Sequence, residues 1–309
     1  MTAEQLTNHN PYYAAQAAGN LVLRGETAPT DPFDVMRAAS ARMFDEYPAL
    51  QGPEKAARLD QFFRDIEAHD RAAYPDMNGA VEQGVPDGYI PDGFVDLGPV
   101  KSLIPSERFE RTMNYVDTYR TLHQHKALFE FVFDNINPKD FAGMPNGELA
   151  YQQTIIANIA EEISATMPYG EPTPREVGGI VPMSEATPAV CQQHGLVSQV
   201  LMQAFGIRSR ISKNFLATNQ DIQLDGIDRA GDSHVSNVVG MHDGVEGREY
   251  MFDSTNPQLD KNGDKTFGFF RLNDQNRNAN GAWIVTEAQG GHRTYLEHSN
   301  MNWTVMRQS

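Results

Sequence analysis

Hydrophobic side chains recur at helical spacing through the first half of the chain. In PEKAARLDQFFRDIEAHDRAAY, residues 53–74, apolar positions return every three or four residues, which predicts a helix with one buried face. DPFDVMRAASARMFDEY predicts an earlier helix, because Asp31-Pro32 suits a cap followed by a first turn. The same spacing predicts helices from Ser106 through Met113 and Leu122 to the aromatic run LFEFVF, and in ELAYQQTIIANIAEEISATMPYG.

Two early segments lack any such period. Residues 1–30 are small and polar, which predicts a flexible arm. Residues 74–105 hold five prolines and five glycines, including the doubled PDGYIPDGF, and can form neither a long helix nor a regular sheet. We expect a long ordered loop or domain joint there, with two consecutive turns favoured over a lid across a cleft.

After Gly206 the hydrophobic period shortens from about four residues to two. Alternating runs parted by turn residues predict short strands in IRSRI, SHVSNVV, REYMFD, TFGFFRL, AWIVTEA, RTYLEH and NWTVM. Helices followed by a mostly antiparallel sheet are typical of an α+β fold.

Composition excludes several classes of protein. The 309 residues are 40% hydrophobic, enough for an ordinary buried core, and no apolar run is long enough to span a membrane. The opening residues lack the pattern of a secretory signal, and a single cysteine suits a reducing cytoplasm. With 41 acidic and 25 basic side chains the formal charge is -16, which disfavours binding to nucleic acid.

The one cysteine lies near a predicted helix start, in TPAVCQQHGLVSQVLMQAFGIRSR. Thr187 is the expected cap, Pro188 suits the first turn, and Gly206 is a natural stop. Cys191 therefore falls in the first turn or so, where unpaired backbone N–H groups and the helix dipole favour a thiolate. The alternative is a small buried hydrophobic side chain, as most free cysteines are.

A histidine and an acid in the strand region could complete a nucleophilic site. If Asp243-Gly244 forms a two-residue hairpin turn, His234 lies directly opposite Asp253, close enough for the carboxylate to hold the imidazole. That is the base and orienting acid of nucleophilic catalysis. A turn at Glu246-Gly247 would instead place Asp253 opposite Gly240.

Together these features resemble the transglutaminase-like superfamily of papain-like thiol enzymes, over roughly residues 140–260. The likeness lies in a cysteine at a helix start, Gly195 four positions later, the helix end GIRSR, a strand histidine and a strand ending FDSTNP. The resemblance implies that Cys191 is the nucleophile, His234 the general base and acid, and Asp253 the orienting acid. It also implies a papain-like core, with the nucleophile helix packed on an antiparallel sheet.

The resemblance divides the chain into a flexible arm at 1–30, a helical extension at 31–139 and a transglutaminase-like catalytic domain at 140–309. It implies acyl transfer through a thioester on peptide or glutamine carboxamides. Hydrolysis, as peptidase or deamidase, is preferred to cross-linking transamidation because nothing marks a site for an amine acceptor. A catalytically inactive binding module with the same fold remains the alternative.

The remaining site and partner expectations follow. The Cys191 backbone N–H is expected to supply half of an oxyanion hole, and Gln152 and Gln153 are candidates for the other half by residue type alone. The expected partner is a protein or peptide substrate, with no nucleic acid and no membrane. A cytoplasmic location is expected, or delivery into another cell, as for a bacterial effector, by a route that needs no signal peptide.

No metal or cofactor site is predicted. His123-Gln124-His125 would point apart on a helix, and DKNGD at 260–264 lacks the glutamate that a calcium loop needs at its twelfth position, which is Arg271. The glycines lack the spacing of a phosphate-binding loop. His194 shares the first helical turns with Cys191 and is expected to be a packed or surface histidine rather than the base.

Overall fold

The structure is a computed structural model that describes residues 32–73, 94–96, 113–115, 118–170, 180–182, 189–218, 232–240, 249–259, 262, 265–272, 283–286 and 292–297. The predicted arm at 1–30, most of the 74–105 loop, the Asp243-Gly244 turn and the NWTVM strand lie outside them.

The helices are α3 (Pro32–Glu46), α4 (Pro53–Ala73), α6 (Thr118–Gln124), α7 (Lys126–Asn135), α8 (Gly147–Thr166) and α9 (Cys191–Ala204), with short 3-10 turns η1 (Tyr47–Ala49) and η2 (Pro138–Phe141). The predicted buried face of α4 is confirmed, since Leu59, Phe62, Phe63 and Ile66 are each at most 3% exposed. None of the described helices has the length and hydrophobicity needed to cross a membrane.

One predicted helix is wrong at its start. Among the described residues of the helix expected from Ser106, Met113 belongs instead to strand β2 (Met113–Tyr115), and helix is found from Thr118. β2 pairs antiparallel with β1 (Phe94–Asp96) and parallel with β3 (Ile180–Pro182). Both partner strands of β2 are distant from it in sequence, so the local spacing of apolar residues could not reveal β2 as a strand.

The main sheet forms after Gly206, where alternation predicted strands. Its strands are β4 (Ser209–Thr218), β5 (Asp232–Gly240), β6 (Glu249–Leu259), β7 (Lys265–Arg271), β8 (Trp283–Thr286) and β9 (His292–Glu297). Within the described part of the chain they pair in the order β7-β6-β5-β4-β9-β8, and every pair is antiparallel. The α+β class is therefore confirmed.

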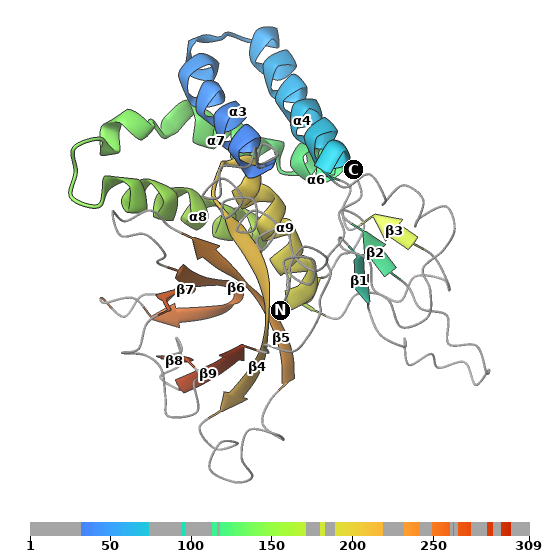
Figure 1. Ribbon diagram of the computed structural model, residues 1–309, viewed down its shortest axis with the longest axis vertical. Helices are drawn as coiled ribbons and strands as arrows, with labels where there is room; N and C mark the ends of the chain where they lie inside the picture. Colours follow the sequence, from blue (N-terminus) through green and yellow to red (C-terminus); the bar gives the residue numbers. More distant parts are fainter. Residues whose placement is uncertain are drawn as a thin grey trace, which may run out of the picture.

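Helix α9 is the central element of the core. It lies between the other helices and the sheet, in contact with β4, β5 and β6 on one side and with α3, α6 and α8 on the other (Figure 1). Phe205 at its end stacks on Phe129 of α7 with ring centroids 4.5 Å apart. One cluster of buried side chains thus includes residues on both sides of position 140, where the catalytic domain is predicted to begin.

The end of α9 has a compact glycine cap. The Ile207 N–H donates to the Met202 carbonyl at 2.8 Å and the Gly206 N–H to the Gln203 carbonyl at 2.9 Å, the two bonds of a Schellman motif. Gly206 has φ +76°, and a Cβ there would lie 3.1 Å from the Cα of Arg37 in α3. Glycine is needed both for the left-handed backbone and for the close approach of α3.

Replacing Gly206 should therefore destabilise the protein in two ways. Gly206→Ala is expected to cost about 1–2 kcal/mol for the left-handed conformation and about 1 kcal/mol or more for the contact with α3. Gly52→Ala is the matched control, because Gly52 has φ +47° with nothing within 4 Å of its would-be Cβ. Urea unfolding should show the larger loss at Gly206, and equal losses would contradict the tight helix contact.

Candidate functional site

Cys191 is the first residue of α9. The cap before it is Val190, in extended conformation, and not the predicted Thr187. The Val190 N–H donates to the Oε1 of Gln193 at 3.0 Å, so a side chain of the first turn satisfies one backbone donor outside the helix. Cys191 therefore sits at the positive end of the dipole, with a backbone N–H that the helix itself does not pair. It is 8% exposed.

The end of α8 fixes where α9 begins. Tyr169 forms a parallel bridge with Ala189, in which the Ala189 N–H donates to the Pro168 carbonyl and the Gly170 N–H to the Ala189 carbonyl, each at 3.0 Å. These bonds hold the residues directly before Cys191 against the chain that leaves α8. The start of α9 is thus set by a contact between two segments, not by a local cap alone.

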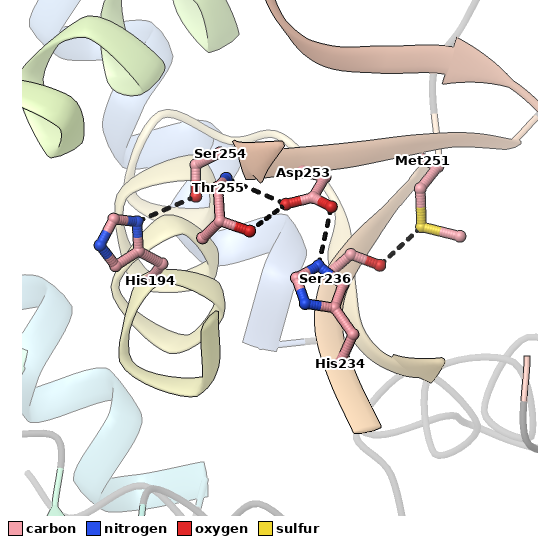
Figure 2. Close-up of polar contacts among 7 residues, drawn as sticks. All are labelled: His194, His234, Ser236, Met251, Asp253, Ser254 and Thr255. Atoms are coloured by element: carbon pink, nitrogen blue, oxygen red, sulfur yellow. Dashed lines mark hydrogen bonds and ion pairs between the residues drawn. The ribbon is translucent and has the colours of Figure 1, made fainter. Parts of the chain in front are cut away.

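The predicted hydrogen bond between His234 and Asp253 is present. The His234 Nε2 lies 2.7 Å from the Asp253 Oδ2, and both residues are buried, at 4% and 2% exposure. The second carboxylate oxygen, Oδ1, accepts from the Thr255 N–H at 2.9 Å and from the Thr255 hydroxyl at 2.7 Å (Figure 2). Both oxygens of the carboxylate are therefore held, and its orientation toward the imidazole is fixed.

The predicted register of the hairpin is wrong by two residues. Asn237 pairs with Phe252, so His234 and Asp253 are not directly opposed. The described pairing ends at Gly240 and Glu249, which also excludes the alternative register. A shift of two residues keeps each side chain on its original face of the sheet, which is why the two side chains still meet.

The charge state of His234 follows from its neighbours. Burial by itself lowers the pKa of His234, but the Asp253 carboxylate, through its charge and hydrogen bond, and then the Cys191 side chain raise this pKa to about 9. Because Nε2 is bonded to Asp253, Nδ1 is the ring nitrogen left to meet the Cys191 sulfur. The arrangement favours an imidazolium held by the Asp253 carboxylate, with the Cys191 side chain at its other nitrogen.

His194 is a packed histidine, one of the two expected alternatives. It is 2% exposed, its Nδ1 lies 3.4 Å from the Ser254 hydroxyl, and its ring meets the Tyr169 ring edge-on at 5.8 Å. Burial lowers the pKa of His194, and the charge on His234 lowers it further, against the opposing effects of the Met167 backbone and Asp253. His194 is thus a neutral ring close to the His234–Asp253 pair.

The structure removes both glutamines from consideration as the second oxyanion donor. Gln152 lies near the start of α8 and its Nε2 donates to the Glu148 carboxylate at 3.4 Å. Cys191 lies beside the opposite end of α8, and the rise of a helix separates Gln152 and Gln153 from that end by about 20 Å. Only their residue type suggested Gln152 and Gln153 as donors. Their position along α8 places both too far from Cys191 to serve.

Sequence reasoning missed two contributors to the site's geometry. Thr255 fixes the Asp253 carboxylate, and the Asn237 Nδ2 donates to the Gly195 carbonyl of α9 at 2.9 Å. The only signal in the sequence for these two residues was the alternation along β5 and β6, in which polar residues occur within strands that are buried. Their partners depend on how α9 lies on the sheet.

No cluster of three or more His, Cys, Asp or Glu residues that could hold a metal ion occurs in the described part of the chain. His125 lies between α6 and α7 and is buried with its Nδ1 3.0 Å from Glu162, while His123 in α6 is exposed.

No family model, curated protein or solved structure matches this chain. The resemblance to the transglutaminase-like superfamily therefore stays a prediction carried by the sequence features and by the geometry above.

The raised pKa of His234 gives a pH dependence with a definite sign. Because its folded pKa of about 9 exceeds the ordinary 6.5, the stabilisation from its protonated form is fully present below pH 6.5 and is lost as pH rises through about 9. We expect NMR titration of the imidazole to place the pKa of His234 well above 6.5 in the native protein, and to find it lowered in Asp253→Asn. Asp140→Asn, an exposed acid in η2, is the control. Equal titration in native protein and Asp253→Asn would show that the carboxylate does not act on the ring.

Proposed function

We propose that this protein is a thiol-dependent acyl-transfer enzyme that acts on peptide or glutamine carboxamides, with hydrolysis as the preferred outcome. The observation that carries the proposal is the placement of Cys191 at the first position of α9, with its side chain acting on a His234 that Asp253 holds from the other ring nitrogen. A nucleophile, a base and an orienting acid in contact are the requirements of covalent acyl transfer.

The chemistry follows from the charge states. The Cys191 thiolate attacks the carbonyl carbon, forming a C–S bond and a tetrahedral oxyanion that the Cys191 backbone N–H stabilises. The proton on the His234 Nδ1 passes to the departing nitrogen, and the C–N bond breaks to leave a thioester. Water then adds to the thioester carbon, His234 takes its proton, and the C–S bond breaks to restore the thiolate.

Burial supports this reading of the three side chains. Cys191, His234 and Asp253 are each less than one-tenth exposed, so little water surrounds the charges that must persist or develop. In such surroundings electrostatic interactions are stronger than in water, and isolated charges are costly unless paired. A carboxylate, an imidazolium and a thiolate in series satisfy that requirement.

The packing of these elements and the chain order of the three residues support a more specific proposal about the fold. We infer a papain-like, transglutaminase-like core from a nucleophile helix packed on an antiparallel sheet, with Cys191, His234 and Asp253 in that chain order. Protein-glutamine transamidation uses the same thioester and differs only in the acceptor, an amine in place of water. Water is preferred because no described residue marks an amine site.

The test is covalent trapping. We expect p-nitrophenyl acetate to acylate Cys191 in the native protein, detected by intact-protein and peptide mass spectrometry, and Cys191→Ala to take up no acyl group. Asp253→Asn should acylate and turn over on the order of 10²-fold more slowly, less than for a serine enzyme because a thiol depends less on its base. Ammonia release from a glutamine peptide library, with and without an added amine, separates deamidase from transamidase.

The controls decide between this proposal and a non-catalytic module. Asp140→Asn should leave acylation unchanged, and circular dichroism should show each variant folded. A native thiol that reacts no faster than free cysteine, with equal rates in Asp253→Asn, would overturn the proposal in favour of an inactive binding module.

A further inference from the structure

We propose that Asn237 and His194 are positioning residues that fasten the first turns of α9 to the two strands carrying His234 and Asp253. This inference rests on the proposed function, because what it sets is the separation between Cys191 and His234. The two contacts use consecutive residues of α9, His194 and Gly195, and reach different strands. We call them the polar clamp.

The β5 contact is the stronger half of the polar clamp. The Asn237 Nδ2 donates to the Gly195 carbonyl at 2.9 Å, and Asn237 is 1% exposed. A helix carbonyl has a second lone pair, so it can accept this bond in addition to its helical partner. The donor lies three residues from His234 and the acceptor four residues from Cys191. The bond therefore links the two reacting side chains through very little backbone.

The β6 contact comes from His194. Its Nδ1 faces the Ser254 hydroxyl at 3.4 Å, and Ser254 directly follows Asp253 in β6 (Figure 2). His194 and His234 lie on either side of the Asp253–Thr255 segment in this view. On its far side the His194 ring meets Tyr169 edge-on and lies near the Met167 backbone at the end of α8. Its Nε2 is buried there without a hydrogen-bond partner among the described residues.

Directional bonds matter at this end of α9 because most of its buried contact is apolar. Side-chain bonds from Gln199 and Gln203 to the Ser209 carbonyl of β4 join the second half of the helix to the sheet. Burial of apolar side chains is non-directional, and such a surface tolerates small shifts along the helix axis. A hydrogen bond weakens steeply when its geometry is lost. A misplacement of about 1 Å at a reacting pair is enough to cost on the order of 10²-fold in rate. The polar clamp therefore fixes the position of α9 relative to β5 and β6, which apolar packing leaves less sharply defined.

The buried amide is difficult to explain by stability alone. Burying an amide costs free energy that its hydrogen bond does little more than offset, and an apolar residue of the same shape would be about as stable there. A buried, hydrogen-bonded polar group instead specifies one arrangement of the elements that it joins. Asn237 is thus placed to fix geometry.

The experiment measures the rate of Cys191 alkylation by iodoacetamide from pH 5 to 10 in the full-length protein. Asn237→Leu removes the donor while keeping the volume, and Ser254→Ala removes only one hydroxyl. Asn158→Leu is the matched control, because its Nδ2 makes the same kind of bond, to the Thr154 carbonyl at 2.8 Å, within α8 and away from the site. Thermal unfolding is recorded for every variant.

We expect the native protein to react rapidly at neutral pH, as a thiolate paired with an imidazolium does. Asn237→Leu should lose on the order of 10²-fold of that neutral rate and follow the profile of an unpaired thiol. Ser254→Ala should change in the same direction by less, and Asn158→Leu should keep the native profile. His194→Asn, which keeps a polar atom near the position of Nδ1, should retain more of the neutral rate than His194→Leu.

The outcomes separate the two proposals. A native protein that already reacts as an unpaired thiol overturns the proposed function. A native profile with the ion-pair signature, kept in Asn237→Leu and in Ser254→Ala, overturns the polar clamp while leaving the proposed function intact. If Asn237→Leu fails to fold, Ser254→Ala and the His194 pair of variants decide the question, because each changes fewer core atoms.

Discussion

The buried position of α9 is the constraint on which the rest of the structure depends. It contacts three strands on one side and three helices on the other, so a large movement of α9 would disturb the whole core. Its C-terminal end is fixed by the close approach of Gly206 to α3. Its N-terminal end is fixed by the bridge between Tyr169 and Ala189. Cys191 thus begins a helix that is held at both ends.

A helix fixed in this way can present a reactive group with little freedom of movement. The first turn of a helix has N–H groups that the helix itself does not pair, and the neighbouring strands supply a histidine and a carboxylate. Burial has two opposite effects on His234. The loss of water by itself lowers the pKa of His234, but it also strengthens the pairing with Asp253, and the second effect is larger, so the pKa is raised. Cys191 joins this pair from the first position of α9.

The polar groups around the site divide the work of holding it. Thr255 occupies one oxygen of the Asp253 carboxylate, so the other is committed to His234. The polar clamp joins α9 to both strands of the hairpin, and His194 contributes as a neutral ring between the end of α8 and β6. Such a network explains why hydrophilic side chains occupy buried positions of β5 and β6. It also gives the proposed acyl transfer the rigid frame that covalent catalysis requires.

The sequence by itself determined the features that depend on local pattern. Helical spacing located α4, α7, α8 and α9, alternation located the strands of the main sheet, and Gly206 marked the end of α9. Side-chain period and backbone freedom depend on neighbouring residues, so the sequence can indicate them. Alternation also put His234 and Asp253 on one face, and that conclusion survived a register error of two residues because the period of a strand is two.

Only the tertiary structure decided what depends on distant segments. The cap at Val190, the strand at Met113, the exclusion of Gln152 and Gln153, and the contacts of His194 and Asn237 all arise where elements far apart in the chain meet. Those meetings are set by how α9 packs among helices and strands. A local pattern indicates which face of an element is buried, but not which distant element that face will meet.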